Sequence, residues 1–249
     1  MLDPRQHQAS SLERLGLRPA PRLVAVGSHG QQQGELPLLW GVCNAWVEQG
    51  FSVMVLDGHA REDAHNLGLM QALQSGVGPG ADPLTQSNWQ VWPAAVGLNT
   101  LLAASDTTDP MGRLATLFAD HNVVLIYTPA PLLTWLLRGS HSAPLLIVPP
   151  LHSASVSAYQ ALKEWVTEGR LQPTVANIAL DPTPPMNPAQ PAPIEKLQRC
   201  AQDHLGYGIA PITVHARAAG EQATRELNRL AWHLFEGALP LHQPQPHEA

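Results

Sequence analysis

Short, uniformly apolar runs alternate along this chain with longer stretches in which apolar residues recur at helical spacing. The short runs are typical of strands buried on both faces of a sheet, and the longer stretches are typical of helices. We expect strands at residues 22–26, 51–56, 88–92, 122–127, 143–148, 173–180 and 210–214. We expect helices at 36–49, 98–104, 110–119, 155–168, 194–205 and 220–237. This alternation predicts an α/β fold with a doubly wound, mostly parallel sheet and helices on both faces.

Prolines near both ends of the chain set the expected domain limits. Pro19 and Pro21 follow a polar, helix-like start, and the last ten residues contain three prolines. The sequence therefore predicts a helical interaction segment and linker at 1–20, one α/β domain at 21–239 and a disordered tail at 240–249.

The composition excludes some classes of binding partner. Hydrophobic residues make up 44% of the chain and charged residues 14%, and the net charge is −6. There is no basic run, so a nucleic-acid surface is not expected. No apolar run approaches the roughly 20 residues of a membrane span, so stable membrane insertion is not expected either. The first residues have no apolar signal region, which favours a cytoplasmic location.

Cysteine and histidine usage gives no sign of a metal site. Cys43 and Cys200 stand singly in predicted helices, as expected of reduced core thiols. Twelve histidines are scattered without the spacing of a metal-binding motif. We therefore expect no metal and no cofactor.

Candidate chemistry is concentrated in residues 22–57. An apolar run leads into a glycine-containing loop, a predicted helix and a second apolar run that ends at Asp57. This is the βαβ frame of a phosphate-binding loop, which requires a lysine and a Ser or Thr directly after its last glycine. Here Gly34 is followed by Glu35 and Leu36. A carboxylate would repel a triphosphate, and a leucine cannot bind Mg²⁺.

The order of motifs over about residues 22–239 resembles the MinD/ParA group of P-loop ATPases. Residues 24–28 resemble the lead-in to the family's loop. By this resemblance, Gly30 stands where the family has its signature lysine and Glu35 where it has the P-loop lysine. Leu36 stands where the Mg²⁺-binding threonine is found, and Gly34 keeps the loop glycine.

Three later motifs extend the same resemblance. Asp57 matches the first aspartate of the second motif, and His59 replaces the aspartate that acts near the attacking water and metal. Tyr127 replaces the metal-coordinating Walker B aspartate, although the Thr-Pro-Ala that follows is kept. Asn177 stands where the family has an adenine-reading asparagine. Because phosphoryl transfer depends on the lost groups, the resemblance implies a pseudo-ATPase with degenerate nucleotide-loop positions and no catalytic residues.

The N-terminal segment resembles a motif of the flagellar member of this group, FlhG (FleN), in which a helix binds and stimulates the GTPase FlhF. Gln8, Ala9 and Leu12 match that motif, while His7 replaces its aspartate. The resemblance implies an FlhF-like GTPase as a protein partner. The alternative is a generic solvated helix.

The sequence therefore predicts a non-catalytic regulatory or scaffold homologue that acts through protein–protein contacts, in the placement or number control of flagella. A partner would recruit it to a cell pole or a membrane machine. One alternative is an accessory scaffold of a pilus, secretion or cellulose-export machine. A second is a residual nucleotide-binding ATPase that uses Asp57, Asn177 and a basic residue such as Arg61 or Arg113. A third is an ordinary α/β domain with no P-loop ancestry. Monomer and homodimer both stay open.

Two further patterns concern packing. The predicted helix at 220–237 has one apolar stripe, and its polar face mixes arginine with glutamate, which favours packing on the sheet over membrane binding. Five tryptophans lie in stretches of helical character, four of them in the helices expected above, and we expect core packing for most of them, with an interface as the alternative. They are Trp40, Trp46, Trp135, Trp165 and Trp232.

Overall fold

The centre of the molecule is a parallel sheet. The computed structural model describes residues 20–78, 89–104, 109–180, 192–216 and 220–241. In these residues the strands are β1 (Arg22–Ser28), β2 (Val53–Asp57), β3 (Gln90–Pro93), β4 (Val123–Pro129), β5 (Leu145–Val148), β6 (Thr174–Ala179), β7 (Ile212–His215) and β8 (Leu239–Pro240). They form one eight-stranded sheet in the order β3-β2-β4-β1-β5-β6-β7, with β8 paired to β1. Only the β1–β8 pair is antiparallel among these strands.

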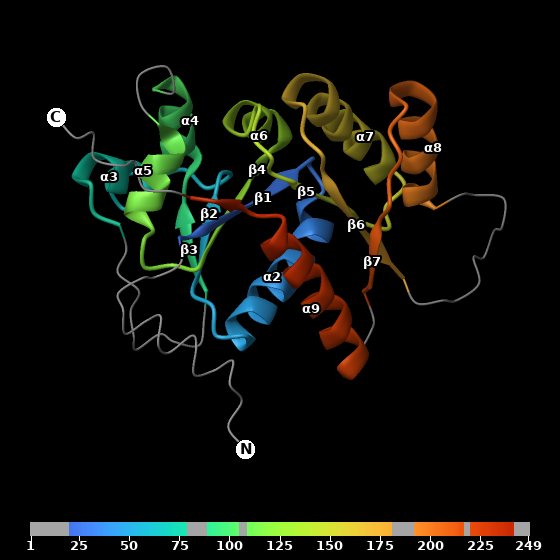
Figure 1. The fold of residues 1–249 in the computed structure, drawn as a ribbon, viewed down its shortest axis with the longest axis horizontal. Coiled ribbons are helices and arrows are strands. Elements are labelled where there is room, and N and C mark those ends of the chain that lie inside the picture. Colours follow the sequence, from blue (N-terminus) through green and yellow to red (C-terminus); the bar gives the residue numbers. More distant parts are fainter. Residues whose placement is uncertain (1–19, 79–88, 105–108, 181–191, 217–219, 242–249) are drawn as a thin grey trace.

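Helices cover both faces of this sheet. They are α2 (Gln32–Glu48), α3 (Leu69–Ser75), α4 (Ala95–Ala103), α5 (Pro110–Leu117), α6 (Ala130–Leu136), α7 (Ala154–Glu164), α8 (Pro193–Leu205) and α9 (Glu221–Glu236). Helices α2 and α9 lie together on one face, and α3 to α8 lie on the other (Figure 1). The prediction of a doubly wound, mostly parallel α/β fold is confirmed.

Each face of the sheet has its own core. Along β1, Leu23 and Ala25 belong to the cluster under α3 to α8, while Val24 and Val26 belong to the cluster under α2 and α9. Successive side chains of a strand point to opposite faces, so both sets must be apolar when both faces are covered. This is why the strands appear in the sequence as uninterrupted apolar runs.

Two short helices differ from the predicted pattern. Helix α3 has seven residues, too few for a helical period to stand out, and ends at Gly76 in the left-handed conformation. Helix α6 begins among prolines, which normally interrupt a helix but are tolerated in its first turn. The helix predicted at 155–168 is α7 followed by a π-helical turn at Trp165–Gly169.

The two ends of the described domain meet beside β1. Arg22 pairs with Pro240 in β8, and the Leu241 N–H donates a 2.8 Å hydrogen bond to the Pro21 carbonyl. Leu241 is buried. Residues 240 and 241, assigned by the sequence to the tail, are therefore part of the packed domain. The predicted N-terminal helix with Gln8, Ala9 and Leu12 lies outside the described residues, as does the tail from 242 onward.

Helix α9 packs on the sheet, as its pattern predicts. Leu230, Ala231 and Leu234 are buried in the core shared with α2. Within the described ranges, no helix has the length and apolar character needed to cross a membrane.

Candidate functional site

The loop between β1 and α2 is folded around a carboxylate of its own chain. Glu35 lies in the first turn of α2 and is fully buried. Its Oε1 accepts hydrogen bonds from the backbone N–H groups of His29 (3.3 Å) and Gln31 (3.2 Å). Backbone N–H groups at the start of a helix favour an anion, and here the side chain of Glu35 supplies it.

The other oxygen of Glu35 is held from the neighbouring strand. Tyr127 is buried near the carboxyl end of β4, and its hydroxyl donates a 2.7 Å hydrogen bond to Glu35 Oε2. Burial raises the pKa of the Tyr127 phenol well above its usual value. A hydrogen bond with Ser28 lowers this pKa, but the negative charges of Glu35 and Asp57 raise it further. Tyr127 therefore stays protonated and acts as the donor.

His29 connects the loop to two further elements. Its side chain is only 2% exposed, and its Nε2 lies 2.7 Å from the Ile147 carbonyl and 3.4 Å from Glu35 Oε1. Its Nδ1 lies 2.8 Å from Ser157 Oγ at the start of α7. A carbonyl can only accept, so Nε2 carries the proton, and in the neutral ring Nδ1 accepts from the Ser157 hydroxyl. The loop is thereby attached to β5 and α7.

Sequence reasoning missed the roles of His29 and Ser157. The two residues are 128 positions apart, and neither stands in a motif that pairs them. A polar residue inside the glycine loop was the one available signal, and it gives no partner.

Glycine is required at Gly30 and at Gly34 for different structural reasons. Gly30 has φ +89° in open space, so the backbone turn itself favours glycine there. At Gly34 a Cβ atom would lie 2.5 Å from Cβ of Pro149, so this glycine allows α2 to approach the segment after β5. Leu36 packs at the edge of the core beneath α2 and offers no ligand oxygen.

Parallel pairing brings four of the predicted site positions to one edge of the sheet. Asp57 is the register partner of Tyr127. The Asp57 carboxylate accepts the His59 N–H at 2.9 Å, and the His59 ring lies 5.0 Å from the Tyr127 ring. Glu35 completes the group through its hydrogen bond to Tyr127. Asn177 is not brought together with them, because β6 is two strands away from β1; its Nδ2 lies 3.5 Å from Thr213 Oγ1.

The groups around Glu35 are poorly suited to a nucleotide phosphate. Among the described residues, the polar contacts of Glu35 come from backbone N–H groups, a phenol and an imidazole, and none comes from lysine or arginine. Arg113, a candidate cation from the sequence, donates to the Leu73 carbonyl and so links α5 to α3. The described part of the chain contains no group of three His, Cys, Asp or Glu side chains arranged to hold a metal ion.

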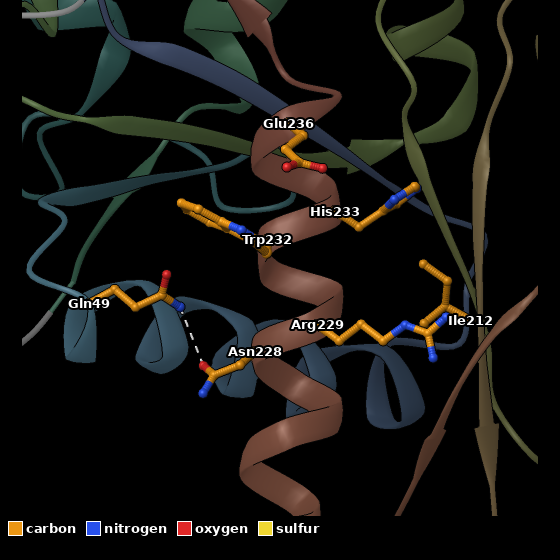
Figure 2. A pocket seen from close by; sticks show the side chains of 7 residues that line it. All are labelled: Gln49, Ile212, Asn228, Arg229, Trp232, His233 and Glu236. Atoms are coloured by element: carbon orange, nitrogen blue, oxygen red, sulfur yellow. Dashed lines mark hydrogen bonds between the residues drawn. The ribbon is translucent and has the colours of Figure 1, made fainter. Parts of the chain in front are cut away.

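A second feature lies along one side of α9, where Phe51 and Phe235 pack against the core. Trp232 stacks on Phe235 at 5.7 Å, Phe51 stacks on Phe235 at 4.8 Å, and the Arg22 guanidinium lies 4.9 Å from the Phe235 ring. These four side chains form the aromatic stack of α9. Beside it is an open hollow of about 590 Å³, where Gln49 of the α2 end contacts Asn228 (Figure 2).

The expectation of core packing is wrong for three of the five tryptophans. Trp46 and Trp165 are fully buried. Trp40, Trp135 and Trp232 are 47%, 62% and 48% exposed. All three lie on helices, but the side of each helix that faces the sheet is decided by its neighbours in space.

Solved structures of low sequence identity share this fold. A ParA family ATPase from Chlorobium tepidum TLS has a TM-score of 0.54 at 12% identity, covering 86% of this chain and 99% of that one. The MinC:MinD cell division protein complex of Aquifex aeolicus has a TM-score of 0.51 at 13% identity, covering 89% and 98%. Cobyrinic acid a,c-diamide synthase from Mycobacterium smegmatis has a TM-score of 0.50 at 16% identity, covering 87% and 94%. No protein-family profile and no curated protein sequence matches the chain. The comparisons therefore establish a fold of the ParA/MinD type.

Proposed function

We propose that this chain is a non-catalytic, MinD/ParA-like regulatory protein that acts through protein contacts. The observation that carries the proposal is the buried carboxylate of Glu35, which takes up the loop N–H groups of His29 and Gln31. A phosphate group would have to displace this carboxylate and would then lie beside a negative charge. No lysine or arginine among the described residues contacts Glu35 to compensate.

Surface features favour protein contacts as the mode of action. Tryptophan and arginine are enriched among the residues that contribute most to protein–protein binding. Trp232 is half exposed in the aromatic stack of α9, next to Arg22 and a broad hollow. The stack offers a partner a rigid apolar surface with a cation beside it.

The process that we propose is the placement or number control of flagella, with an FlhF-like GTPase as partner. The support for this finer assignment is the N-terminal match at Gln8, Ala9 and Leu12. A glutamine side chain offered to a GTPase site can orient the attacking water. In this proposal the GTPase recruits the chain to its site of action at the cell pole.

The first experiment measures nucleotide binding and hydrolysis. We expect no change in Tm with millimolar ATP·Mg²⁺ or ADP, and no hydrolysis above the background rate. A native-state ligand present well above its Kd must raise Tm, so a shift of several degrees would overturn the proposal that the loop is closed to nucleotide. The variant Glu35→Ala serves as the matched comparison, because it removes the carboxylate and leaves the N–H groups in place.

The second experiment tests the partner. We expect a cognate FlhF-like GTPase to be captured by the full chain and its hydrolysis rate to rise. The variant Gln8→Ala should remove the rate increase, whereas Gln6→Ala, two residues earlier, should keep it. Trp232→Ala should weaken capture, whereas Trp135→Ala, at a more exposed tryptophan on the opposite face of the sheet, should not. Absence of capture by the full chain would reject the flagellar assignment.

A further inference from the structure

Four exposed side chains form one line along the outward side of α9, here named the α9 stripe. They are Arg225, Arg229, Trp232 and Glu236. An α-helix has 3.6 residues per turn, so spacings of four, three and four residues keep them within roughly 60° of the helix circumference. Figure 2 shows the last three of them along the helix. The buried residues of α9 lie on the side that faces the sheet.

The stripe has two cations toward the start of the helix, then an indole and then a carboxylate. The side chain of Arg225 is 77% exposed, and its 3.6 Å ion pair with the exposed Glu221 contributes little. Its guanidinium has five N–H donors and can also meet a carboxylate from outside. Trp232 is 48% exposed and is held by parallel stacking on Phe235. The stripe therefore combines charges with a fixed aromatic ring.

The order of these groups is complementary to its own reverse. An antiparallel second α9, related by a two-fold axis between positions 230 and 231, brings Arg225 beside Glu236 of the second copy. The same axis brings Arg229 beside Trp232 of the second copy, because both pairs of positions are centred on one point of the helix. Two-fold symmetry makes each contact occur twice. A guanidinium binds both a carboxylate and the face of an indole favourably.

Other arrangements of the two helices lack this match. A parallel pair would set Arg225 against Arg225 and Glu236 against Glu236, and such like-charge contacts are unfavourable. In the antiparallel pair, the indole of the second copy lies over Arg229, at the edge of the hollow of about 590 Å³. The lining of that hollow also includes the apolar side chain of Ile212. The hollow thus leaves room for the incoming ring.

We propose that the α9 stripe binds the same stripe of a second copy of this chain, in an antiparallel pair with two-fold symmetry. The contact uses one helix face, whereas a standard interface buries about 800 Å² per partner, so we expect a weak dimer. The proposal rests on the proposed action through protein contacts and names one occupant of the surface around Trp232. A dimer presents two N-terminal segments, which would strengthen capture of an immobilised GTPase.

Sedimentation velocity of the full chain, without nucleotide or GTPase, measures the dimer directly. Over a hundredfold range of concentration we expect a monomer–dimer equilibrium that weakens with added salt, because salt screens exposed ion pairs. Trp232→Ala should raise the dimer Kd at least tenfold, whereas Trp135→Ala should change it less than twofold. A monomer at every concentration, or a dimer that Trp232→Ala does not weaken, would overturn the proposal.

Exchange of the two charges tests the antiparallel register. Arg225→Glu and Glu236→Arg, made singly, each set like charges opposite one another and should raise the dimer Kd at least tenfold. The double variant restores opposite charges and should return the Kd to within threefold of the unmodified chain. Thr224→Glu adds a negative charge at an exposed neighbour outside the stripe and should change the Kd less than twofold. A double variant as weak as either single variant would reject the register.

The dimer and the GTPase contact are separated by these measurements. A chain that stays monomeric but captures the GTPase would reject the dimer and leave the proposed function standing. A chain that dimerises through the stripe but captures no GTPase would reject the flagellar assignment and leave the dimer standing.

Discussion

The Tyr127 hydroxyl donates a 2.7 Å hydrogen bond to the Glu35 carboxylate, joining residues that are 92 positions apart in the chain. The resemblance to the MinD/ParA group predicts that both positions depart from that group's motifs. In the folded chain the two departures complement each other. A buried carboxylate requires donors, and a buried phenol requires an acceptor. The pair forms an internal contact in which the carboxylate and the phenol satisfy each other.

Tyr127→Phe is expected to lower the free energy of unfolding by about 1–3 kcal/mol, because it leaves one oxygen of a buried carboxylate without a donor. Urea unfolding measures the change. Tyr159→Phe on α7 is the matched control and should change stability by no more than about 0.5 kcal/mol. In a double-mutant cycle, Glu35→Gln should make the Tyr127→Phe substitution less costly. If Tyr127→Phe lowered the free energy of unfolding equally in the unmodified chain and in Glu35→Gln, the contact would contribute nothing.

Gly27→Ala is expected to be strongly destabilising. A Cβ at this position would lie 2.2 Å from Cζ2 of Trp165, which is fully buried and held by its hydrogen bond to the Ala130 carbonyl. Overpacking of a core costs about 1–3 kcal/mol and often more when the neighbour cannot move. Gly30→Ala is the comparison, because its φ of +89° adds backbone strain of about 1–2 kcal/mol but no clash. The urea unfolding midpoint should be lower for Gly27→Ala than for Gly30→Ala. A lower midpoint for Gly30→Ala would contradict the packing argument.

Glu62→Gln is expected to destabilise the region around α3 and α4. The buried Glu62 carboxylate accepts hydrogen bonds from the backbone N–H groups of Met70 (3.2 Å), Val96 (2.7 Å) and Gly97 (2.8 Å), at the start of both helices. Hydrogen bonds to a charged group each contribute about 1.5–3 kcal/mol, and an amide offers one acceptor oxygen in place of two. We expect a loss of about 2 kcal/mol. Hydrogen exchange should quicken first in α3 and α4, and Glu48→Gln on the surface should have no such effect.

The buried thiol of Cys43 is expected to make stability fall at alkaline pH. Burial raises the pKa of Cys43 from 9.0 to about 12. Between these values the unfolded chain loses the thiol proton and the folded chain keeps it, so its contribution is complete below pH 9 and decreases as pH rises. The slope approaches about 1.4 kcal/mol per pH unit above pH 9. Cys43→Ala should flatten the change in urea midpoint between pH 8 and 10, while Cys200→Ala should keep it. The same slope in both variants would contradict the assignment.

The sheet could be predicted from sequence because both of its faces are covered. Strands β1, β4 and β5 have no solvent-facing residue in their apolar runs, so a simple pattern locates them. Helices α3 and α6 could not be predicted in this way, because seven residues flanked by glycine or proline show no clear helical period of apolar residues. Their positions depend on tertiary contacts, such as those of Leu69 and Leu133 in the core.

The sequence predicts which residues of the candidate site lie at the same edge of the sheet, but it does not predict which side chains contact each other. Parallel pairing brings Asp57 and Tyr127 to one edge, as motif order suggests. The burial of Glu35 could not be foreseen, because an acidic residue in a first helical turn is ordinarily solvated. Its burial depends on Tyr127 and His29, which reach it from a distant strand and from the loop.

The pairing of β8 with the start of β1 brings the two ends of the described domain to one place. Ala20 and Leu241 flank the same strand end at Arg22, whereas the loop around Glu35 follows the opposite end of β1, after Ser28. A strand of seven residues spans roughly 23 Å. The points where the chain enters and leaves the described domain thus lie about one strand length away from the loop around Glu35.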